Sequence, residues 1–354
     1  MKLKLRILIF AILLGGISLS AKTRSQAPKD EYVIVFYNQE NLFDIYDDPV
    51  IHDEEFTPDG VKKWTMVKYK KKIANMSKVL FDLAKTVKAY PTIIGVSETE
   101  NRHVLEDLVS TPDLLKANYQ IVQYDSPDAR GIDCALFYRP DKFKLLWSKP
   151  IKTIIPSRPD FRTRDILAVC GTIDNELFCF FVNHWSSRWG GSEQSSYLRE
   201  GAAATLKHFA DSLQIAQPGI KMVMMGDLND DPQDKSVHEV LGAKEEPDMV
   251  GKNGYFNPFF NILKAGFGTL GYHDAWNLFD NMIVNANLLN APKGSIALKQ
   301  NKTDKYHFYG YIFKRKYMIQ QEGKYKNYPL RTFSGNTFQN GYSDHLPVYI
   351  KIGK

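Results

Sequence analysis

Residues 92–98 have the sequence TIIGVSE, an apolar run that ends at the carboxylate of Glu98. A short run rich in β-branched residues, placed directly after Pro91, predicts a buried β-strand. Four more apolar runs carry acids, amides or histidines at one end: VIVFY before Asn38 and Glu40, FCFFV before Asn183 and His184, MVMMG before Asp227 and Asn229, and LPVYIKI after Ser343, Asp344 and His345. Any one of these residues could be an ordinary cap or turn residue. Because strand ends are where rigid scaffolds present chemistry, the repetition predicts one shared site.

Other segments predict the elements around this site. Apolar residues recur at helical spacing from Val61 to Ala89, and a second helix is expected from about Glu193 to Leu213. The lysines of KYKKK (68–72) are interpreted as a solvated helix face, with a nucleic-acid patch as the alternative. Further strands are expected at YQIVQY, DCALFY, DILAVCGTI and ELFCFFVNH and within 277–289, whereas 242–271 is expected to form long surface loops. The order of elements predicts mixed sheets covered by helices in one domain.

The first 21 residues have the pattern of a cleaved export signal. Lys2, Lys4 and Arg6 precede an apolar stretch at 7–19, and small residues follow it. A retained N-terminal anchor is the alternative, although the apolar stretch is short for a membrane span. We therefore expect a signal at 1–21, a flexible segment at 22–31 and a folded domain at 32–354. The expected location is periplasmic or extracellular, without a stable membrane anchor after cleavage.

Charge and cysteine content constrain the function less tightly. The formal net charge of +6 becomes +3 without the three basic residues of the signal, which is weak support for a nucleic-acid partner. Three cysteines are too few for a disulfide-based scaffold. Cys170 and Cys179 lie in apolar runs typical of buried thiols. A disulfide between these two residues across a hairpin is the alternative that stays open.

The residue types at the strand ends narrow the chemistry. Carboxylates and amides without cysteine ligands suit a hard divalent cation such as Mg²⁺, Mn²⁺ or Ca²⁺, and two unclustered histidines suit proton transfer or phosphate contact. The chain has no GxxxxGK[ST] loop, and no GxGxxG follows a strand. GVSETE lacks the second glycine of a serine-hydrolase nucleophile elbow. Metal-dependent hydrolysis with water as the nucleophile is the class that remains.

Six ordered motifs resemble the signatures of the endonuclease/exonuclease/phosphatase superfamily, which includes deoxyribonuclease I-like nucleases, inositol-polyphosphate 5-phosphatases and neutral sphingomyelinases. The motifs are YNQENLF, IIGVSETEN, VNHWSSRWGG, MGDLND, WNLFDNMIV and GYSDHLPV, which together span nearly the whole chain after the signal. Their forms are most similar to those of exported bacterial members of unassigned substrate. The resemblance implies an α/β (α+β) fold, a four-layer α/β/β/α sandwich with two central mixed β-sheets, and makes 32–354 the catalytic domain.

The resemblance also implies a role for each matching residue. The metal site is expected to contain Asn38, Glu40, Glu98 and Asp344, with Glu98 as the principal ligand. The catalytic group is expected to contain His184, Asp227, Asn229, Asp280 and His345, with Asp280 orienting His345. Arg164 is similar to a phosphate-contacting arginine. Independently of the resemblance, Trp185 and Arg188, together with Trp189, follow His184 in the sequence, so they are expected in the substrate wall, or else to pack their loop against the helix that begins near Glu193. The general base is either Asp227 or His345.

These expectations predict an exported phosphoesterase that uses Mg²⁺, with Mn²⁺ or Ca²⁺ as alternatives, and hydrolyses phosphodiester bonds in a nuclease-like manner. A phosphatase or phospholipase C-type enzyme acting on sugar phosphates or sphingomyelin-like lipids is the second hypothesis. A non-catalytic binding protein that retains the fold is the third. The expected partner is a phosphate-ester substrate such as nucleic acid; no protein partner is predicted, and the protein is expected to be a monomer.

Overall fold

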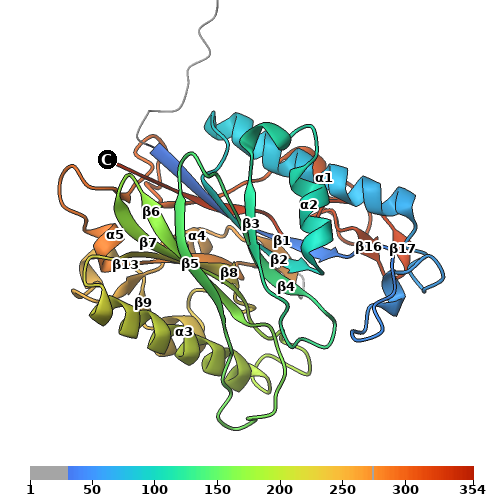
Figure 1. Cartoon of the computed structure of the whole chain (residues 1–354), viewed down its shortest axis with the longest axis horizontal. Helices are drawn as coiled ribbons and strands as arrows, with labels where there is room; N and C mark the ends of the chain where they lie inside the picture. The colour runs from blue at the N-terminus through green and yellow to red at the C-terminus, as the bar shows by residue number, and fades with distance from the viewer. Residues whose placement is uncertain (1–30, 273–274) are drawn as a thin grey trace, which may run out of the picture.

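The apolar runs form strands of two large sheets in the computed structural model, which describes residues 31–272 and 275–354 (Figure 1). The first seven-stranded sheet contains, in spatial order, β14 (Ala297–Leu298), β18 (Val348–Gly353), β1 (Glu31–Leu42), β2 (Ile93–Thr99), β4 (Asp133–Tyr138) and β3 (Gln120–Gln123), with β15 (Gly310–Ile312) also paired to β18. The second contains β5 (Lys144–Ile151), β6 (Ile166–Ile173), β7 (Glu176–His184), β8 (Lys221–Asp227), β13 (Asp280–Asn285), β10 (Tyr255–Phe256) and β9 (Ala243–Lys244). Parallel and antiparallel pairs occur in both, so the sheets are mixed as predicted.

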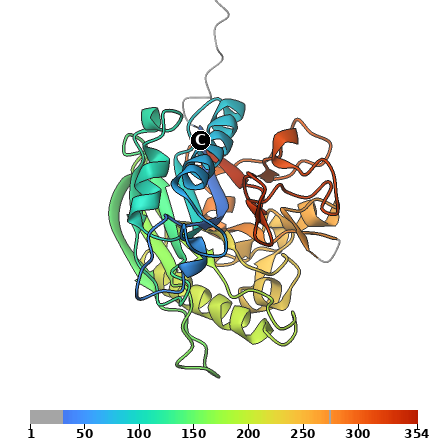
Figure 2. The ribbon, with the colours of Figure 1, turned by 90° about the vertical axis from the view of Figure 1, so that its right-hand side faces the viewer.

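Helices cover the outer face of each sheet. α1 (Met66–Val87) and α2 (Arg102–Val109) cover the first sheet, and α3 (Ser196–Ala216) covers the second, on the opposite side of the molecule (Figures 1 and 2). Successive side chains of a strand point to opposite faces. Accordingly, Val33 and Val35 of β1 join the apolar cluster beneath α1 and α2, whereas Ile34 and Phe36 join the cluster between the sheets. A third cluster lies beneath α3, which confirms the predicted four-layer α/β/β/α sandwich.

The two sheets approach each other closely near the predicted site. A Cβ atom at Gly95 of β2 would lie 2.6 Å from Sδ of Met225 in β8, so the Met225 side chain would have to shift. Within the second sheet, a Cβ atom at Gly226 would lie 2.3 Å from the carbonyl oxygen of Asn183. Glycine at these two positions therefore permits the close packing that holds the ends of β2, β7 and β8 together.

Strand direction explains why five distant segments meet at one edge. β1 is parallel to β2, and β7 is parallel to β8, so the carboxyl ends of each pair lie side by side. In the β7–β8 register His184 is opposite Asp227. β13 runs antiparallel to β8 and places Asp280 opposite Asp227. β18 runs antiparallel to β1, so the segment that precedes β18 returns to the carboxyl end of β1.

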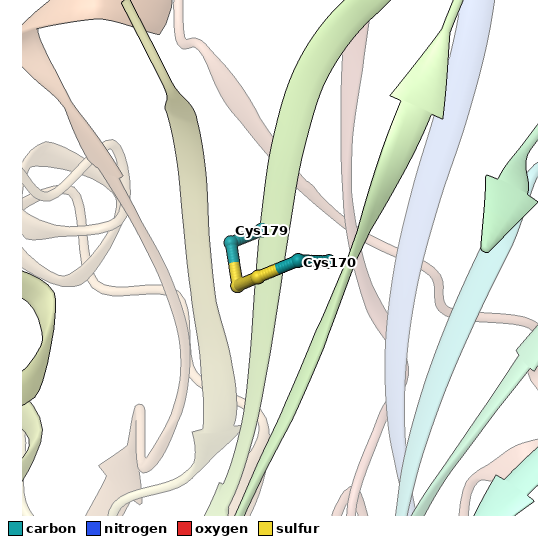
Figure 3. Close-up of a disulfide and its surroundings, with 2 residues drawn as sticks. All are labelled: Cys170 and Cys179. Atoms are coloured by element: carbon teal, nitrogen blue, oxygen red, sulfur yellow. A yellow bond between two sulfur atoms is a disulfide. The ribbon is translucent and has the colours of Figure 1, made fainter. Parts of the chain in front are cut away.

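The predicted β6–β7 hairpin resolves the question of the cysteines. Its two-residue turn, Asp174 and Asn175, has φ angles of 48° and 64°, the left-handed conformations that such turns require. The register places Cys170 directly opposite Cys179, and the two form a disulfide (Figure 3). Cys134 is free and buried. The disulfide across the hairpin is therefore the correct alternative, and the interpretation of Cys170 and Cys179 as buried free thiols is wrong.

Two predictions about the first helix are wrong: its first residue and the exposure of Lys72. The helix begins at Met66 instead of Val61, because the preceding residues form turns in which Trp64 N donates to Thr57 O (2.9 Å). Lys72 was assigned to a solvated face, but its side chain is 0% exposed. This interpretation of KYKKK is therefore wrong for Lys72.

The expectation of long surface loops at 242–271 is also corrected. This region contributes β9, β10, α4 (Phe260–Lys264) and β11 (Leu270–Tyr272), which pairs with β12 (Ala275–Asn277). Phe256 and Phe259 are buried in the core between the sheets. The later predicted strand at 277–289 is β13 followed by the short helix α5 (Ala286–Leu289), and β16 (Phe333–Ser334) and β17 (Thr337–Phe338) form a small hairpin.

The predicted export signal at 1–21 lies outside the described residues, as does the flexible segment apart from Glu31. Within the described part of the chain, no helix combines the length and the apolar character needed to cross a membrane.

Candidate active site

Four predicted site residues lie together where the carboxyl ends of β1, β2, β7 and β8 meet. They are Asn38, Glu98, His184 and Asp227. Asn38 Nδ2 donates to Glu98 Oε1 (3.1 Å) and to Asp227 Oδ2 (2.9 Å), so one amide joins the ends of β1, β2 and β8. His184 Nε2 lies 3.7 Å from Glu98 Oε1 and 3.9 Å from Asp227 Oδ2. Glu98 has the most exposed side chain of the four, at 14%. The group is therefore mostly buried and reaches solvent through Glu98.

His345 and Asp280 form a second group that shares Asp227 with the first. His345 Nδ1 lies 2.8 Å from Asp280 Oδ2, and His345 Nε2 lies 3.6 Å from Asp227 Oδ2. The Ser343 hydroxyl fixes this segment, because it donates to Asn38 O (2.8 Å) and accepts from His345 N (3.1 Å). The structure thus brings the predicted His–Asp pair together and orients its second ring nitrogen toward Asp227.

Several site residues have left-handed backbone conformations. The φ angles are 47° at Glu40, 52° at Asn41, 57° at Glu98 and 50° at Asn229. Residues with a Cβ atom adopt such angles at a cost, and they concentrate at functional sites. Glu98 lies where the register between β2 and β4 shifts, so the irregularity turns its carboxylate toward the site.

The two histidines differ in their charge environment. Burial lowers the pKa of His184 well below 6.5, and nearby arginines lower it further. Burial opposes the charged form of His345 too, but the surrounding carboxylates of Asp280, Asp227 and Asp344 raise its pKa well above 6.5. Burial raises the pKa of Asp227 to about 6, against the opposing charge of His345.

Glu40 and Asp344, which were predicted as metal ligands, are paired with cations. Glu40 lies 3.8 Å from Lys72 Nζ and 3.5 Å from Arg331 Nε, and it accepts a hydrogen bond from Thr332 N (2.6 Å). Arg331 also donates to Asp344 Oδ2. Neither acid belongs to the clusters of ligand atoms found among the described residues. Their role as ligands stays a prediction, and a metal would compete with these cations.

Arg164 and Arg188 hold the loops that follow β7 and β8. Arg164 donates to His184 O (3.2 Å) and pairs with Asp128 (2.9 Å). Arg188 donates to Asn229 O (2.8 Å). Its guanidinium group also forms ion pairs with three acids of the same loop, Asp230, Asp231 and Asp234. Both guanidinium groups already have protein partners, so their predicted contact with substrate stays a prediction.

Trp185 lies in the core, contrary to its predicted place in the substrate wall. Its side chain is 2% exposed and belongs to the apolar cluster that contains Ala202 and Ala203 of α3. The alternative, packing against this helix, is therefore correct for Trp185. Its carbonyl oxygen accepts from Asn229 Nδ2 (2.9 Å), which fixes the Asn229 amide beside the site. Trp189, by contrast, is 89% exposed.

The donor set fits a hard divalent cation. Glu98, His184 and Asp227 each offer a ligand atom, and these atoms lie within 4.8 Å of one another; Asp227, Asp280 and His345 form a second such group. Carboxylate oxygens suit Mg²⁺, and an imidazole in the set makes Mn²⁺ acceptable as well. His184 Nδ1 is buried and has no hydrogen-bond partner within the described structure. The first group is the better candidate for a metal site, because a cation can reach it from solvent through the carboxylate of Glu98, which is 14% exposed. The side chains of the second group are at most 7% exposed.

Sequence reasoning missed three cations beside the site, two of them paired with acids. Lys72 lies three residues after Tyr69 and four before Met76, both buried, so helical spacing could have placed it on the buried face. Arg331 lies in a loop, and its partner Glu40 is 291 positions away in sequence numbering. Arg130, which donates to Asn41 Oδ1, lies in a loop as well. No sequence pattern marks either arginine.

Comparisons with known proteins agree with this fold. Similar solved structures include a humanized D. rerio TDP2 (12% identity, TM-score 0.53, covering 92% of this chain and 99% of that chain). They also include the human Nocturnin catalytic domain with bound sulfate anion (14%, 0.51, 91% and 94%) and a Bacteroides thetaiotaomicron mannosyl-6-phosphatase (16%, 0.52, 91% and 100%). At these identities the likeness concerns the fold alone. A comparison with curated protein sequences finds no match.

A family comparison covers the site as well as the fold. Residues 33–354 match the Endonuclease/Exonuclease/phosphatase family, so the match includes every strand end that carries a site residue. The chain therefore belongs to the endonuclease/exonuclease/phosphatase family, whose members are hydrolases of phosphoester bonds.

Proposed function

We propose that the protein is an exported, divalent-metal-dependent phosphodiesterase with nuclease-like activity. The proposal is carried by the convergence of Asn38, Glu98, His184, Asp227 and His345 at one sheet edge. Burying carboxylates side by side is unfavourable, because they lose hydration and repel one another. A cluster of this kind is characteristic of a functional site, and a cation together with a phosphate ester would balance its charge.

Glu98, Asp227 and His184 would hold the cation, and Asn38 would orient the two carboxylates. A divalent ion supplies polarisation of a phosphoryl oxygen and stabilisation of charge on the leaving oxygen. We propose Mg²⁺ as the ion, with Mn²⁺ as the alternative that the imidazole ligand favours.

His345 and Asp227 would divide the proton transfers. Three carboxylates surround His345, so its protonated form is favoured and can donate to an oxygen of the substrate. Asp227 is then the group that accepts the proton of the attacking water. Asn229 would donate a hydrogen bond to a phosphoryl oxygen, because preorganised donors of this kind contribute strongly to catalysis.

Export is supported by the sequence and by the cysteine chemistry. Residues 1–21 have the pattern of a cleaved signal. The Cys170–Cys179 disulfide suits an oxidising compartment, because structural disulfides are rare in the reducing cytosol. We therefore propose a periplasmic or extracellular monomer without a protein partner.

Nucleic acid or a small phosphodiester is the substrate that we propose. A charge of +3 after signal removal does not suit tight non-specific binding of duplex DNA, so we expect turnover with modest affinity. Phosphatase or phospholipase C-type activity is the second hypothesis, which differs in substrate and not in catalytic residues. A non-catalytic binding protein is the third.

The test is a panel of substrates assayed side by side with Mg²⁺ or Mn²⁺ and again with EDTA. The panel contains single-stranded DNA, plasmid DNA, RNA, bis-p-nitrophenyl phosphate, a sugar phosphate, an inositol phosphate and sphingomyelin. We expect metal-dependent cleavage of nucleic acid and of bis-p-nitrophenyl phosphate, lost in Asp227→Asn and retained in Arg315→Ala, an exposed arginine near the end of α1. Preferential cleavage of a monoester or of sphingomyelin would favour the second hypothesis. Absence of turnover on the whole panel would favour the third.

A further inference from the structure

An aromatic pocket lies outside the catalytic cluster, between α4, β12, β15 and the loop that precedes β15. Its volume is about 400 Å³, within the range of sites for small ligands. None of its lining residues belongs to the predicted metal, catalytic or substrate-binding groups. The lining is mostly aromatic and aliphatic, and it includes Phe267, Trp276, Tyr306, Phe308, Tyr311 and Lys314.

Ring contacts hold the aromatic wall of this pocket together. Tyr306 stacks on Phe308 with the ring centroids 4.9 Å apart, and Phe267 packs edge-on against Tyr306 at 5.8 Å. Tyr306 and Phe267 are nevertheless 43% and 44% exposed. Large apolar side chains that remain exposed side by side are characteristic of a binding site. Aromatic rings of this kind suit a planar partner, on which they can stack.

The two charged residues of the lining, Asp304 and Lys314, differ in their partners. The Asp304 carboxylate accepts hydrogen bonds from the backbone N–H groups of Tyr306 (2.8 Å) and His307 (2.9 Å), so it caps its own turn. Lys314 Nζ lies 4.4 Å from the centroid of the Trp276 ring, and within residues 31–272 and 275–354 no acid lies at ion-pair distance from it. Partial burial lowers the pKa of Lys314. A cation without a counter-charge beside an aromatic wall favours an anionic ligand.

The chain around the pocket is strongly basic. Residues 293–331 contain ten lysines or arginines and two acids, a net charge of +8, whereas the remainder of residues 22–354 has a net charge of −5. Within this segment, Lys305 Nζ lies 4.7 Å from the centroid of the Tyr306 ring. Such an excess of one charge raises the local concentration of anions.

We propose that this pocket binds a nucleotide, with the base against the aromatic wall and the phosphate at Lys314. A nucleotide combines the planar ring that the aromatic residues favour with the anionic group that the unpaired lysine favours. A free nucleotide and the terminal nucleotide of a nucleic-acid strand share this chemistry, and their affinities distinguish them. The inference goes beyond the proposed function, because it requires neither turnover nor the catalytic metal.

The first experiment is calorimetric titration of the protein in EDTA with three probes: thymidine 5′-monophosphate, thymidine and inorganic phosphate. We expect the nucleotide to bind on the order of tenfold more tightly than thymidine or phosphate, because only the nucleotide engages both the rings and the lysine. Lys314→Gln should weaken nucleotide binding on the order of tenfold and leave thymidine binding unchanged, whereas Tyr306→Ala should weaken both. Equal affinity for the nucleotide and the better of the other two probes, or equal nucleotide affinity in the wild-type protein and both variants, would overturn the inference.

Control variants separate this pocket from other surfaces and from the catalytic cluster. Tyr325→Ala and Lys316→Gln remove an exposed ring and an exposed lysine of the same basic segment that do not line the pocket, so nucleotide affinity should be preserved. Asp227→Asn should also preserve it, because Asp227 lies outside the pocket. Loss of binding in Asp227→Asn, with unchanged affinity in Lys314→Gln, would place the nucleotide at the catalytic cluster and overturn the inference. Circular dichroism should show that Lys314→Gln and Tyr306→Ala are folded, since both side chains are exposed.

A second titration distinguishes the two sources of the nucleotide. If the pocket holds the end of a strand, the 5′-phosphorylated tetrathymidylate pTpTpTpT should bind more tightly than thymidine 5′-monophosphate, and Lys314→Gln should weaken both. Equal affinities that Lys314→Gln lowers alike would assign the pocket to the free nucleotide, which supports the inference as well. Binding of phosphatidylglycerol vesicles without binding of either nucleotide would overturn it in favour of a membrane surface. These titrations need no cleavage, so failure of the nuclease proposal and failure of the nucleotide pocket are separate results.

Discussion

His184 and His345 reach the same acidic cluster from two regions of the molecule that differ in charge. His184 is the last residue of β7, and its Nε2 lies 3.7 Å from Glu98 and 3.9 Å from Asp227. Arg164 and Arg130 are nearby. His345 precedes β18 and has a carboxylate 2.8 Å from one ring nitrogen and others 3.6 Å and 3.9 Å from the second. Burial and the nearby arginines therefore lower the pKa of His184, whereas the surrounding carboxylates raise the pKa of His345.

This difference shows how one acidic cluster can contain both a neutral imidazole and an imidazolium. A neutral imidazole can bind a metal or donate one hydrogen bond, whereas an imidazolium offers positive charge to a phosphate. The environment of each ring, set by strand pairing, decides which role it takes. Asp280 is critical to this division, because it lies fully buried against His345 in the strand next to Asp227.

The largest expected effect follows from removing a member shared by both regions. Asp227→Asn and Glu98→Ala should each lower kcat on the order of a hundredfold or more, as should His345→Ala, because each removes a positioned group. Circular dichroism should show that all three variants are folded. Near-wild-type turnover in the three variants, on any substrate that the parent cleaves, would contradict the mechanism.

A smaller effect is expected when the comparison between the histidines is broken. Asp280→Asn keeps the shape of the side chain but removes the nearest negative charge from His345. The pKa of His345 should fall and kcat should drop on the order of tenfold to a hundredfold, because the imidazolium is less populated. Histidine NMR titration of the metal-free variant measures the pKa; an unchanged value for His345 would contradict the assigned cause, and His184 serves as the internal control.

The two regions also differ in how they are anchored. β7, which carries His184, is joined to β6 by the disulfide, whereas the segment of His345 is held by Ser343 through hydrogen bonds. The double variant Cys170→Ala, Cys179→Ala should lose about 2 to 3 kcal/mol of unfolding free energy, the amount expected for a short closed loop. Chemical denaturation measures the loss. Dithiothreitol should destabilise the wild-type protein but not the double variant, and its failure to do so would contradict a structural disulfide.

Acidification should affect the two histidines in opposite senses. The folded pKa of His184 lies below 6.5, so its stabilising contribution is present at pH 7 and is lost as the pH falls. The folded pKa of His345 lies above 6.5, so its contribution persists in acid and is lost at higher pH. In metal-free protein, His184→Asn should reduce the stability lost between pH 7 and pH 5 by at most about 2 kcal/mol. Identical losses in the variant and the parent would contradict the neutral assignment.

Much of the fold was predictable because the strands are apolar runs with polar ends. Glu98, His184, Asp227 and His345 were identifiable because each adjoins a buried strand, and strand direction brings such ends together. The 242–271 region was misinterpreted because its glycines, asparagines and prolines mask Phe256 and Phe259, which tertiary packing buries in the core.

The partners of the site residues were less predictable, because they depend on contacts between distant segments. The pairing of Glu40 with Lys72 requires a buried lysine, which is rare in folded proteins, and its pairing with Arg331 joins segments that are 291 positions apart. Trp185 follows His184 directly, so proximity in sequence suggested a substrate contact. Only the direction of its side chain, into the cluster beneath α3, assigns it to the core.

The convergence of the site on one cation can be tested directly by histidine NMR with Mn²⁺, whose paramagnetism broadens nearby ring signals. The chain has eight histidines: His52, His103, His184, His208, His238, His273, His307 and His345. We predict that substoichiometric Mn²⁺ broadens the signals of His184 and His345 before the others, and that Glu98→Ala abolishes this selectivity. Broadening that spares these two histidines, or that persists unchanged in Glu98→Ala, would contradict a shared metal centre.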